Sequence, residues 1–112
     1  MANTFKLVNN AVMSTVAGTS DALYTVPSST TTIILGLTLC NVHTAQVLAT
    51  VEIVDTSASV TSTVIKNAPI PVGGSLEIMS GNKIVVETTD VVKVSSSVAD
   101  KISATMSIME IT

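Results

Sequence analysis

The residues able to support chemistry are few, and their spacing matches none of the common reaction centres. His43 is the only histidine, and no Gly-x-Ser-x-Gly sequence presents a serine nucleophile to it. Cys40 is the only cysteine, which rules out an intrachain disulfide and a zinc site built from several cysteines. Because no cation lies near Cys40 in the sequence, we expect it to behave as a small, half-buried apolar residue.

The carboxylates are spread along the chain and form no Asp-x-Asp-x-Asp-Gly calcium loop. Asp55 begins a Ser/Thr-rich loop, Asp90 lies in a turn and Asp100 precedes a strand-like segment. Asp at such positions accepts hydrogen bonds from the nearby backbone. Gly73-Gly74 precedes a strand-like segment and not a helix, so it indicates a tight turn. We therefore expect no metal, no cofactor and no enzymatic activity.

The charge balance argues against nucleic acid and membrane partners. Five lysines, no arginine and eight acidic residues give a net charge of −3, and aromatic residues make up 2% of the chain. Nucleic-acid binding needs clustered cations or aromatic stacking platforms. No apolar run reaches the ~18–20 residues of a membrane helix, since Gly36 and Thr38 interrupt the longest one. The first residues lack the pattern of a secretory signal, and we expect a protein made without export.

The composition predicts strands. Among 112 residues are 17 valines and 17 threonines, and charged residues make up 12%, about half the usual share of about 25%. Residues 46–55 alternate between apolar and mixed positions, and residues 101–112 do the same. The apolar positions expected on one face are Val47, Ala49, Val51 and Ile53 in the first segment and Ile102, Ala104, Met106 and Ile108 in the second.

A third segment, residues 32–41, is apolar on both faces, which is typical of a central or covered strand. Strict alternation over this segment predicts two opposite faces. One face consists of Ile33, Leu35, Leu37 and Leu39, and the other of Ile34, Gly36, Thr38 and Cys40. The five dispersed methionines are typical of core filler.

Turn signals separate these segments at regular intervals. Residues 17–21 indicate a hairpin between strands at 11–16 and 22–26, and further turns are expected at 80–82 and 88–90. Pro69 and Pro71 confine their segment to an edge position. Eight or nine short strands at this spacing predict an all-β fold, a single antiparallel β-sandwich of jelly-roll type that forms one domain over residues 1–112.

The surface of such a sandwich is unusual, because Ser and Thr replace the usual Lys and Glu and alternate with apolar residues such as Ile34, Leu48, Val85 and Val91. Monomers seldom expose large apolar patches, and uncharged edge strands pair with other chains. We therefore expect a homo-oligomer or a larger assembly.

Several segments, taken in order, resemble small virion proteins of tailed bacteriophages. They are Leu23-Tyr-Thr-Val-Pro-Ser-Ser-Thr-Thr-Thr-Ile-Ile-Leu-Gly-Leu-Thr-Leu-Cys-Asn41, Ile70-Pro-Val-Gly-Gly-Ser-Leu-Glu77 and Gly81-Asn-Lys-Ile-Val-Val-Glu-Thr-Thr-Asp-Val-Val-Lys-Val94. With the opening Met-Ala-Asn-Thr-Phe-Lys-Leu and the ending Ser-Ile-Met-Glu-Ile-Thr112, nearly the whole chain is similar to proteins of marine cyanophages. Each motif alone is ordinary β-turn sequence, so the resemblance depends on their order and combination.

The resemblance implies a structural component of the virion, assembled in the host cytoplasm. Its first reading is a capsid decoration, or cement, protein that binds the major capsid protein on the outer surface as a homotrimer. A head–tail connector, tail or baseplate component is the alternative within the same particle. A host-glycan-binding module at a fibre tip is a further alternative, although its loops would lack aromatic residues and arginine.

Six apolar residues are candidates for contact with partners. They are Phe5, Leu7, Val8, Leu48, Val85 and Val91. The first three lie in an N-terminal segment that is either the first strand of the sandwich or an arm that crosses to a neighbour, and pairing with another chain would use the same residues in both cases. The other three lie on strand faces where a soluble monomer usually carries charge.

Overall fold

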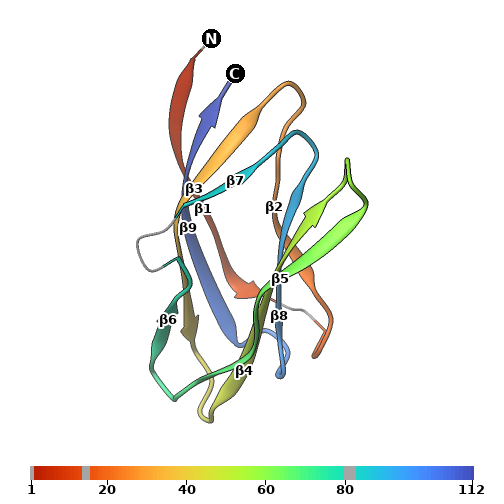
Figure 1. Cartoon of the computed structure of the whole chain (residues 1–112). Coiled ribbons are helices and arrows are strands. Elements are labelled where there is room, and N and C mark those ends of the chain that lie inside the picture. Colours follow the sequence, from red (N-terminus) through yellow and green to blue (C-terminus); the bar gives the residue numbers. More distant parts are fainter. Residues whose placement is uncertain (1, 14–15, 80–82) are drawn as a thin grey trace.

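The computed structural model describes residues 2–13, 16–79 and 83–112, and within these ranges the regular secondary structure consists of strands (Figure 1). Nine strands are present in the described part of the chain, as expected. They are β1 (Asn3–Met13), β2 (Asp21–Thr25), β3 (Thr31–Asn41), β4 (Val47–Asp55), β5 (Val60–Ile70), β6 (Ser75–Glu77), β7 (Ile84–Val86), β8 (Val91–Ser96) and β9 (Ile102–Ile111).

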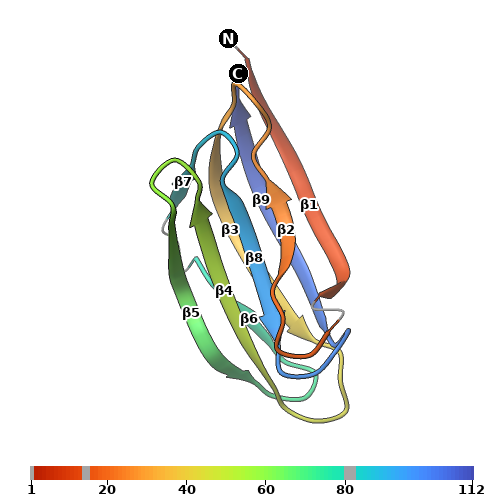
Figure 2. The same cartoon turned by 90° about the vertical axis from the view of Figure 1, so that its right-hand side faces the viewer.

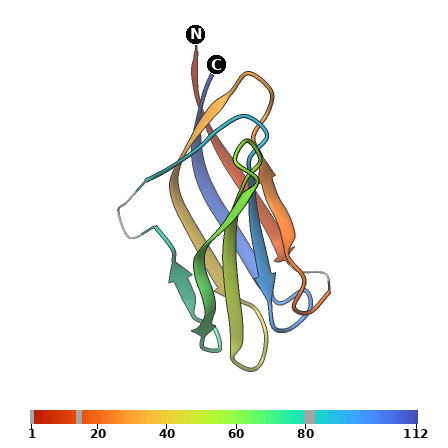
Figure 3. The ribbon, with the colours of Figure 1, turned by 45° about the vertical axis from the view of Figure 1, so that its right-hand side comes forward.

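The strands pair in a nested order. β1 pairs with β9, β2 with β8, β3 with both β6 and β7, and β4 with β5, and all of these pairs are antiparallel. β7 and β6 contact successive stretches of β3, so together they occupy the position of one strand (Figure 3). A long hairpin that is rolled up on itself gives this nesting, which is the topology of a jelly roll. The predicted fold class is confirmed.

The two sheets form the layers of the sandwich (Figure 2). One has the order β1-β9-β3-β6, with β7 also on β3, and the other has the order β2-β8-β4-β5. The prediction of a hairpin between residues 11–16 and 22–26 is wrong, because β1 and β2 belong to different sheets. The connecting segment crosses between the layers, where the Gly18 N–H donates to the Ser96 carbonyl over 2.8 Å. Residues 14 and 15 of the expected hairpin lie outside the described residues.

A β-bulge in β3 corrects the predicted faces of that strand. The register with β9 shifts between Ile34 and Gly36, so one extra residue, Leu35, is inserted. The core face is therefore formed by Ile34 before the bulge and by Leu37 and Leu39 after it. Strict alternation failed here because a bulge changes the phase of the pattern without changing its composition.

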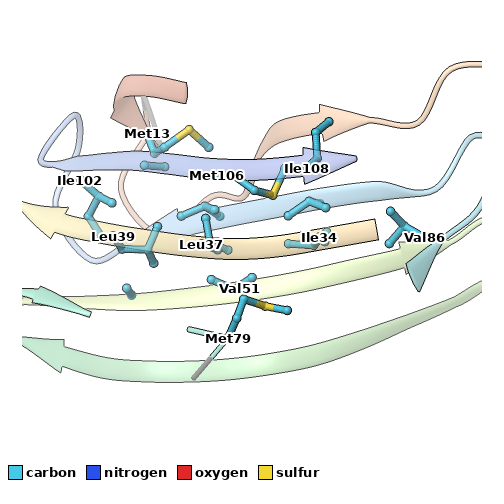
Figure 4. Close-up of a cluster of buried hydrophobic side chains, with 14 of the residues drawn as sticks. Met13, Ile34, Leu37, Leu39, Val51, Met79, Val86, Ile102, Met106 and Ile108 are labelled. Carbon is cyan, nitrogen blue, oxygen red and sulfur yellow. The ribbon is translucent and has the colours of Figure 1, made fainter. Parts of the chain in front are cut away.

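Apolar side chains from both layers fill the space between the sheets (Figure 4). The predicted inner faces of β4 and β9 are confirmed, with Val47, Ala49 and Val51 of β4 almost fully buried. Of the five methionines expected as core filler, Met13, Met79 and Met106 are buried in the core. The expectation is wrong for Met109, which alternates with the buried Ile108 and points away from the core, and Met1 lies outside the described residues. Burial of each large apolar side chain contributes about 1.5–3 kcal/mol.

Buried polar residues fix the loops at both ends of the sandwich. The Asn41 amide donates to the carbonyls of Ala45 and Ile70, both over 2.9 Å. At the other end, the Asp90 carboxylate accepts a hydrogen bond from the Glu87 N–H over 2.9 Å, which confirms the expected turn at 88–90. The expected turn at 80–82 lies outside the described residues.

The turn predicted at Gly73-Gly74 is confirmed. The Gly74 N–H donates to the Pro71 carbonyl over 2.9 Å, and Gly73 has a φ of 68°, which favours glycine. Pro69 lies in β5, at the edge of its sheet, as expected for a proline-containing strand. The two chain ends lie side by side at the opposite end of the molecule, where Ala2 and Thr112 exchange two backbone hydrogen bonds (Figure 1).

Candidate interaction surface

The side chains with chemical potential occupy separate, locally satisfied positions. His43 is half-buried in the loop after β3, where its backbone N–H donates to the Asn41 carboxamide oxygen over 2.7 Å. Cys40 is half-buried, as expected. The Asp55 carboxylate accepts hydrogen bonds from the Ser57 hydroxyl and the Ala58 N–H, and the Ser57 bond in particular holds the pKa of Asp55 below its usual value.

Within the described residues, no three His, Cys, Asp or Glu side chains come together in a way that could hold a metal ion. Across the same residues, no helix is long and apolar enough to cross a membrane. What the structure offers instead is two contrasting surfaces, one on the outer face of each sheet.

The outer face of the β2-β8-β4-β5 sheet carries a polar depression of about 360 Å³. Its lining includes Glu52, Lys66 and several serines, and the Ser20 hydroxyl donates to the Glu52 carboxylate over 2.9 Å. These groups can hydrogen-bond to a polar ligand. The lining holds no histidine, cysteine or aromatic residue, so it provides neither a nucleophile–base pair nor a stacking platform for a sugar.

Part of the outer face of the other sheet is apolar, whereas Thr38, Thr105 and Glu77 lie further along the same face. In the strand register, Phe5 of β1 lies opposite Met109 of β9, Met109 lies opposite Ile33 of β3, and Ile33 lies opposite Val85 of β7. Directly opposed residues point to the same side of a sheet. These four side chains therefore form one continuous row across the sheet, on the side away from the core.

Further apolar residues widen this row into a patch, which we call the outer apolar face. It consists of Phe5, Leu7, Ile33, Leu35, Val85, Met109 and Ile111. The exposed fractions of Phe5, Leu7 and Val85 are 72%, 63% and 59%. None of the seven is charged.

The structure gathers three of the six predicted interface residues and separates the others. Phe5, Leu7 and Val85 all belong to the outer apolar face. Val8 points to the inner side of β1 and packs against the core cluster. Leu48 and Val91 lie on the outer face of the other sheet, Leu48 near the start of β4 and Val91 opposite Val54 near its end. The N-terminal segment forms the first strand of the sandwich, which is one of its two expected states.

A polar cluster that the sequence analysis missed connects the two layers on the inner side of the β1-β9-β3 sheet. The Tyr24 hydroxyl of β2 donates to the Glu110 carboxylate of β9 over 2.5 Å and lies 2.8 Å from the Thr32 hydroxyl of β3. The Lys6 ammonium of β1 forms an ion pair with the other Glu110 oxygen at 2.8 Å. The cluster thus ties β1, β9 and β3 of one sheet to β2 of the other.

The cluster changes the acidity of its members. Burial of the phenol and its hydrogen bond to Glu110 raise the pKa of Tyr24 to about 12. The contacts from Lys6 and Tyr24 hold the pKa of Glu110 below its usual value. One sequence signal existed: Glu110 continues the inward phase of β9 after Met106 and Ile108, and a carboxylate at a core position needs partners.

No protein-family model matches this chain, and no curated protein matches it. Solved structures do. A chain of the T13 particle of infectious bursal disease virus superposes with a TM-score of 0.60 at 10% sequence identity, over 96% of this chain and 30% of the viral one. The VP2 subviral particle of the same virus gives 0.53 at 9% identity, over 96% and 32%.

A structure of Bacillus endospore appendages, which form disulfide-linked pili, matches with a TM-score of 0.58 at 13% identity, over 99% of this chain and 87% of that one. This chain thus spans about a third of the viral chains but most of the pilus chain. At these identities the likeness shows the fold alone.

Proposed function

We propose that this protein is a non-enzymatic structural component of a virion. More specifically, we propose that it is a capsid decoration protein of a tailed phage, and the sequence resemblance suggests a marine cyanophage. Residues 1–112 act as one domain that binds the major capsid protein on the outer shell as an oligomer, a trimer by the resemblance. Binding across neighbouring capsid subunits would bury further area and stabilise the shell.

The outer apolar face carries this proposal. Seven uncharged apolar side chains on one sheet fit a subunit whose surface is covered in an assembly. The jelly roll supports the same reading, because this fold builds viral capsids, although it also occurs in lectins and cupins. The structural neighbours named above come from a viral particle and from a pilus, both of which are assemblies of many copies.

A connector, tail or baseplate component remains the alternative, because it would use the same apolar surface. Copy number separates these positions, since a capsid lattice holds many copies and a neck or tail ring few. The fibre-tip module would have to use the polar depression beside Glu52, whose lining has no aromatic residue. It predicts measurable association with host surface polysaccharide, which decoration does not.

The test is quantitative mass spectrometry of purified particles. The ratio of this chain to the major capsid protein should lie between about one-third and one for decoration of a symmetric lattice. A ratio near one-hundredth moves the protein to the neck, tail or baseplate, and its absence from particles refutes the virion proposal.

A pair of variants sharpens the test. Val85→Lys places a charge on the outer apolar face, and Val72→Lys places one at a position with the same exposed fraction of 59%, in the turn between β5 and β6. Val85→Lys should fold but lower the number of bound copies, whereas Val72→Lys should bind normally. Full binding by both variants contradicts the role of this face.

A further inference from the structure

The sandwich has four sheet edges, and three of them carry features that prevent pairing with another chain. The edge formed by β6 and β7 consists of two strands of three residues each. β2 has five residues and a register shift between Ala22 and Tyr24. β5 has two register shifts against β4, and it contains Pro69 and a residue with positive φ, Asn67 (48°).

The fourth edge, β1, carries none of these features over most of its length. Its register with β9 runs without a shift from Asn3 to Asn10, and it contains no proline (Figure 2). A lysine on an edge strand normally discourages pairing. The one charge on β1, that of Lys6, is instead tied to Glu110 at 2.8 Å.

From this contrast we propose that β1 pairs antiparallel with β1 of a second copy, about a two-fold axis at Phe5. Opposed residues must share a face, so the axis passes through a residue position. An axis at Phe5 places Phe5 opposite Phe5, Thr4 opposite Lys6 and Asn3 opposite Leu7. An axis at Lys6 would place two ammonium groups opposite each other, which is unfavourable.

An axis at Leu7 is also free of like-charge pairs, but it places Phe5 opposite Asn9. The Phe5 axis instead forms an aromatic pair from the chain's only phenylalanine, which is 72% exposed in the single copy. It also joins the two rows of the outer apolar face. Val85, Ile33, Met109 and Phe5 of one copy continue into the same four residues of the second copy.

The contact is small. It covers residues 2–8 of each strand, a length of about 23 Å, and falls at the low end of specific interfaces, below about 1,200 Å² in total. We therefore expect a dimer that dissociates on dilution. An edge contact about a two-fold axis closes at two copies, so it differs from the trimer that the resemblance implies.

Sedimentation of the intact protein across a dilution series tests the pairing. Phe5→Lys puts two like charges in opposition and should raise the dissociation constant by about tenfold or more while the fold, followed by circular dichroism, persists. Val60→Lys on β5, at a position that is 50% exposed, is the matched control and should associate as the wild type does. A monomer at all concentrations, or a trimer insensitive to Phe5→Lys, overturns the inference.

Disulfide trapping tests the register in a Cys40→Ser background, which removes the chain's own thiol. Opposed Cα atoms lie about 4.5–5.5 Å apart, within the range that a disulfide can bridge. Phe5→Cys should therefore cross-link rapidly. With the axis at Phe5, the two Leu7 positions are offset by four residues, about 13 Å, so Leu7→Cys should cross-link slowly. The reverse order, or no cross-link from either variant, refutes the proposed axis.

The inference names a self-contact for the proposed virion subunit, yet the two can fail separately. A Phe5-dependent dimer that is absent from particles overturns the function and leaves the pairing intact. If the protein is present in particles but stays monomeric before assembly, the pairing is overturned and the function is left intact.

Discussion

β1 and β5 are both eleven-residue edge strands, one in each sheet. The free edge of β5 is protected against pairing with another chain, whereas that of β1 is not. β5 is interrupted by two register shifts, by Asn67 in the left-handed region and by Pro69. β1 runs regularly to Asn10 and keeps its one charge in an intramolecular ion pair. Strand length therefore does not decide whether an edge is protected. A few residues of special geometry do.

The charges on the two strands illustrate the same point. Lys66 of β5 is exposed and beside the polar depression, where it can repel an incoming strand. Lys6 of β1 is half-exposed, but its ammonium contacts the nearly buried Glu110. The same residue type therefore protects one edge and leaves the other available.

The largest expected effect comes from breaking the ion pair that distinguishes β1. Glu110→Ala removes the partner of Lys6 and of the Tyr24 hydroxyl, and it should lower the free energy of unfolding by about 2 kcal/mol. The freed Lys6 charge should also weaken self-association, because β1 then resembles a protected edge. Urea denaturation measures the first effect and sedimentation the second. Exposed Glu87→Ala is the control, and equal stability of the two variants would contradict the role of the cluster.

An intermediate effect is expected from pH at Tyr24 of β2, whose hydroxyl contacts the same Glu110 carboxylate. The pKa of Tyr24 is raised from 10.0 to about 12 in the folded protein, so its contribution to stability is complete below pH 10 and is lost as the pH rises through 12. The comparison is therefore between wild type and Tyr24→Phe, whose urea midpoints should converge between pH 10 and 12. Parallel curves would show that this hydroxyl does not stabilise the layers.

The smallest effect concerns the protection of β5. Asn67 has a φ of 48°, and its N–H donates to the Thr50 hydroxyl over 3.0 Å. Asn67→Ala keeps the backbone donor but places a Cβ-bearing residue of lower left-handed preference there, which should cost about 1 kcal/mol. Asn67→Gly should cost less, because glycine adopts this conformation freely. If alanine is the better tolerated of the two in thermal melts, backbone geometry is not what Asn67 supplies.

The alternation of apolar and polar residues in the sequence was sufficient to predict which side of a regular strand faces the core. The inner faces of β4 and β9 follow from residues such as Val47, Val51 and Met106, and the turn at Gly73-Gly74 follows from glycine chemistry. The bulge at Leu35 was not predictable, because one inserted residue shifts the phase without leaving a compositional mark.

Contacts between strands that are distant in the chain could not be predicted from the residue pattern, because that pattern does not specify which strands pair. The false hairpin before Asp21 arose because neighbours in sequence usually pair, whereas a jelly roll sends them to different sheets. The outer apolar face needs the register of four strands, which joins Phe5 to Val85 across eighty positions of sequence. Phe5, Leu7 and Val85 could be selected individually as apolar and exposed, but their grouping required the fold.

The pairing of the chain ends determines where the chain can be circularly permuted or fused to another protein. Ala2 and Thr112 exchange backbone hydrogen bonds at one pole, and the Asn41 loop and the Gly73-Gly74 turn lie at the other. A short linker can therefore join the ends in a circular permutant that reopens at a distal loop. A cargo fused to either terminus would project from the same pole of the sandwich.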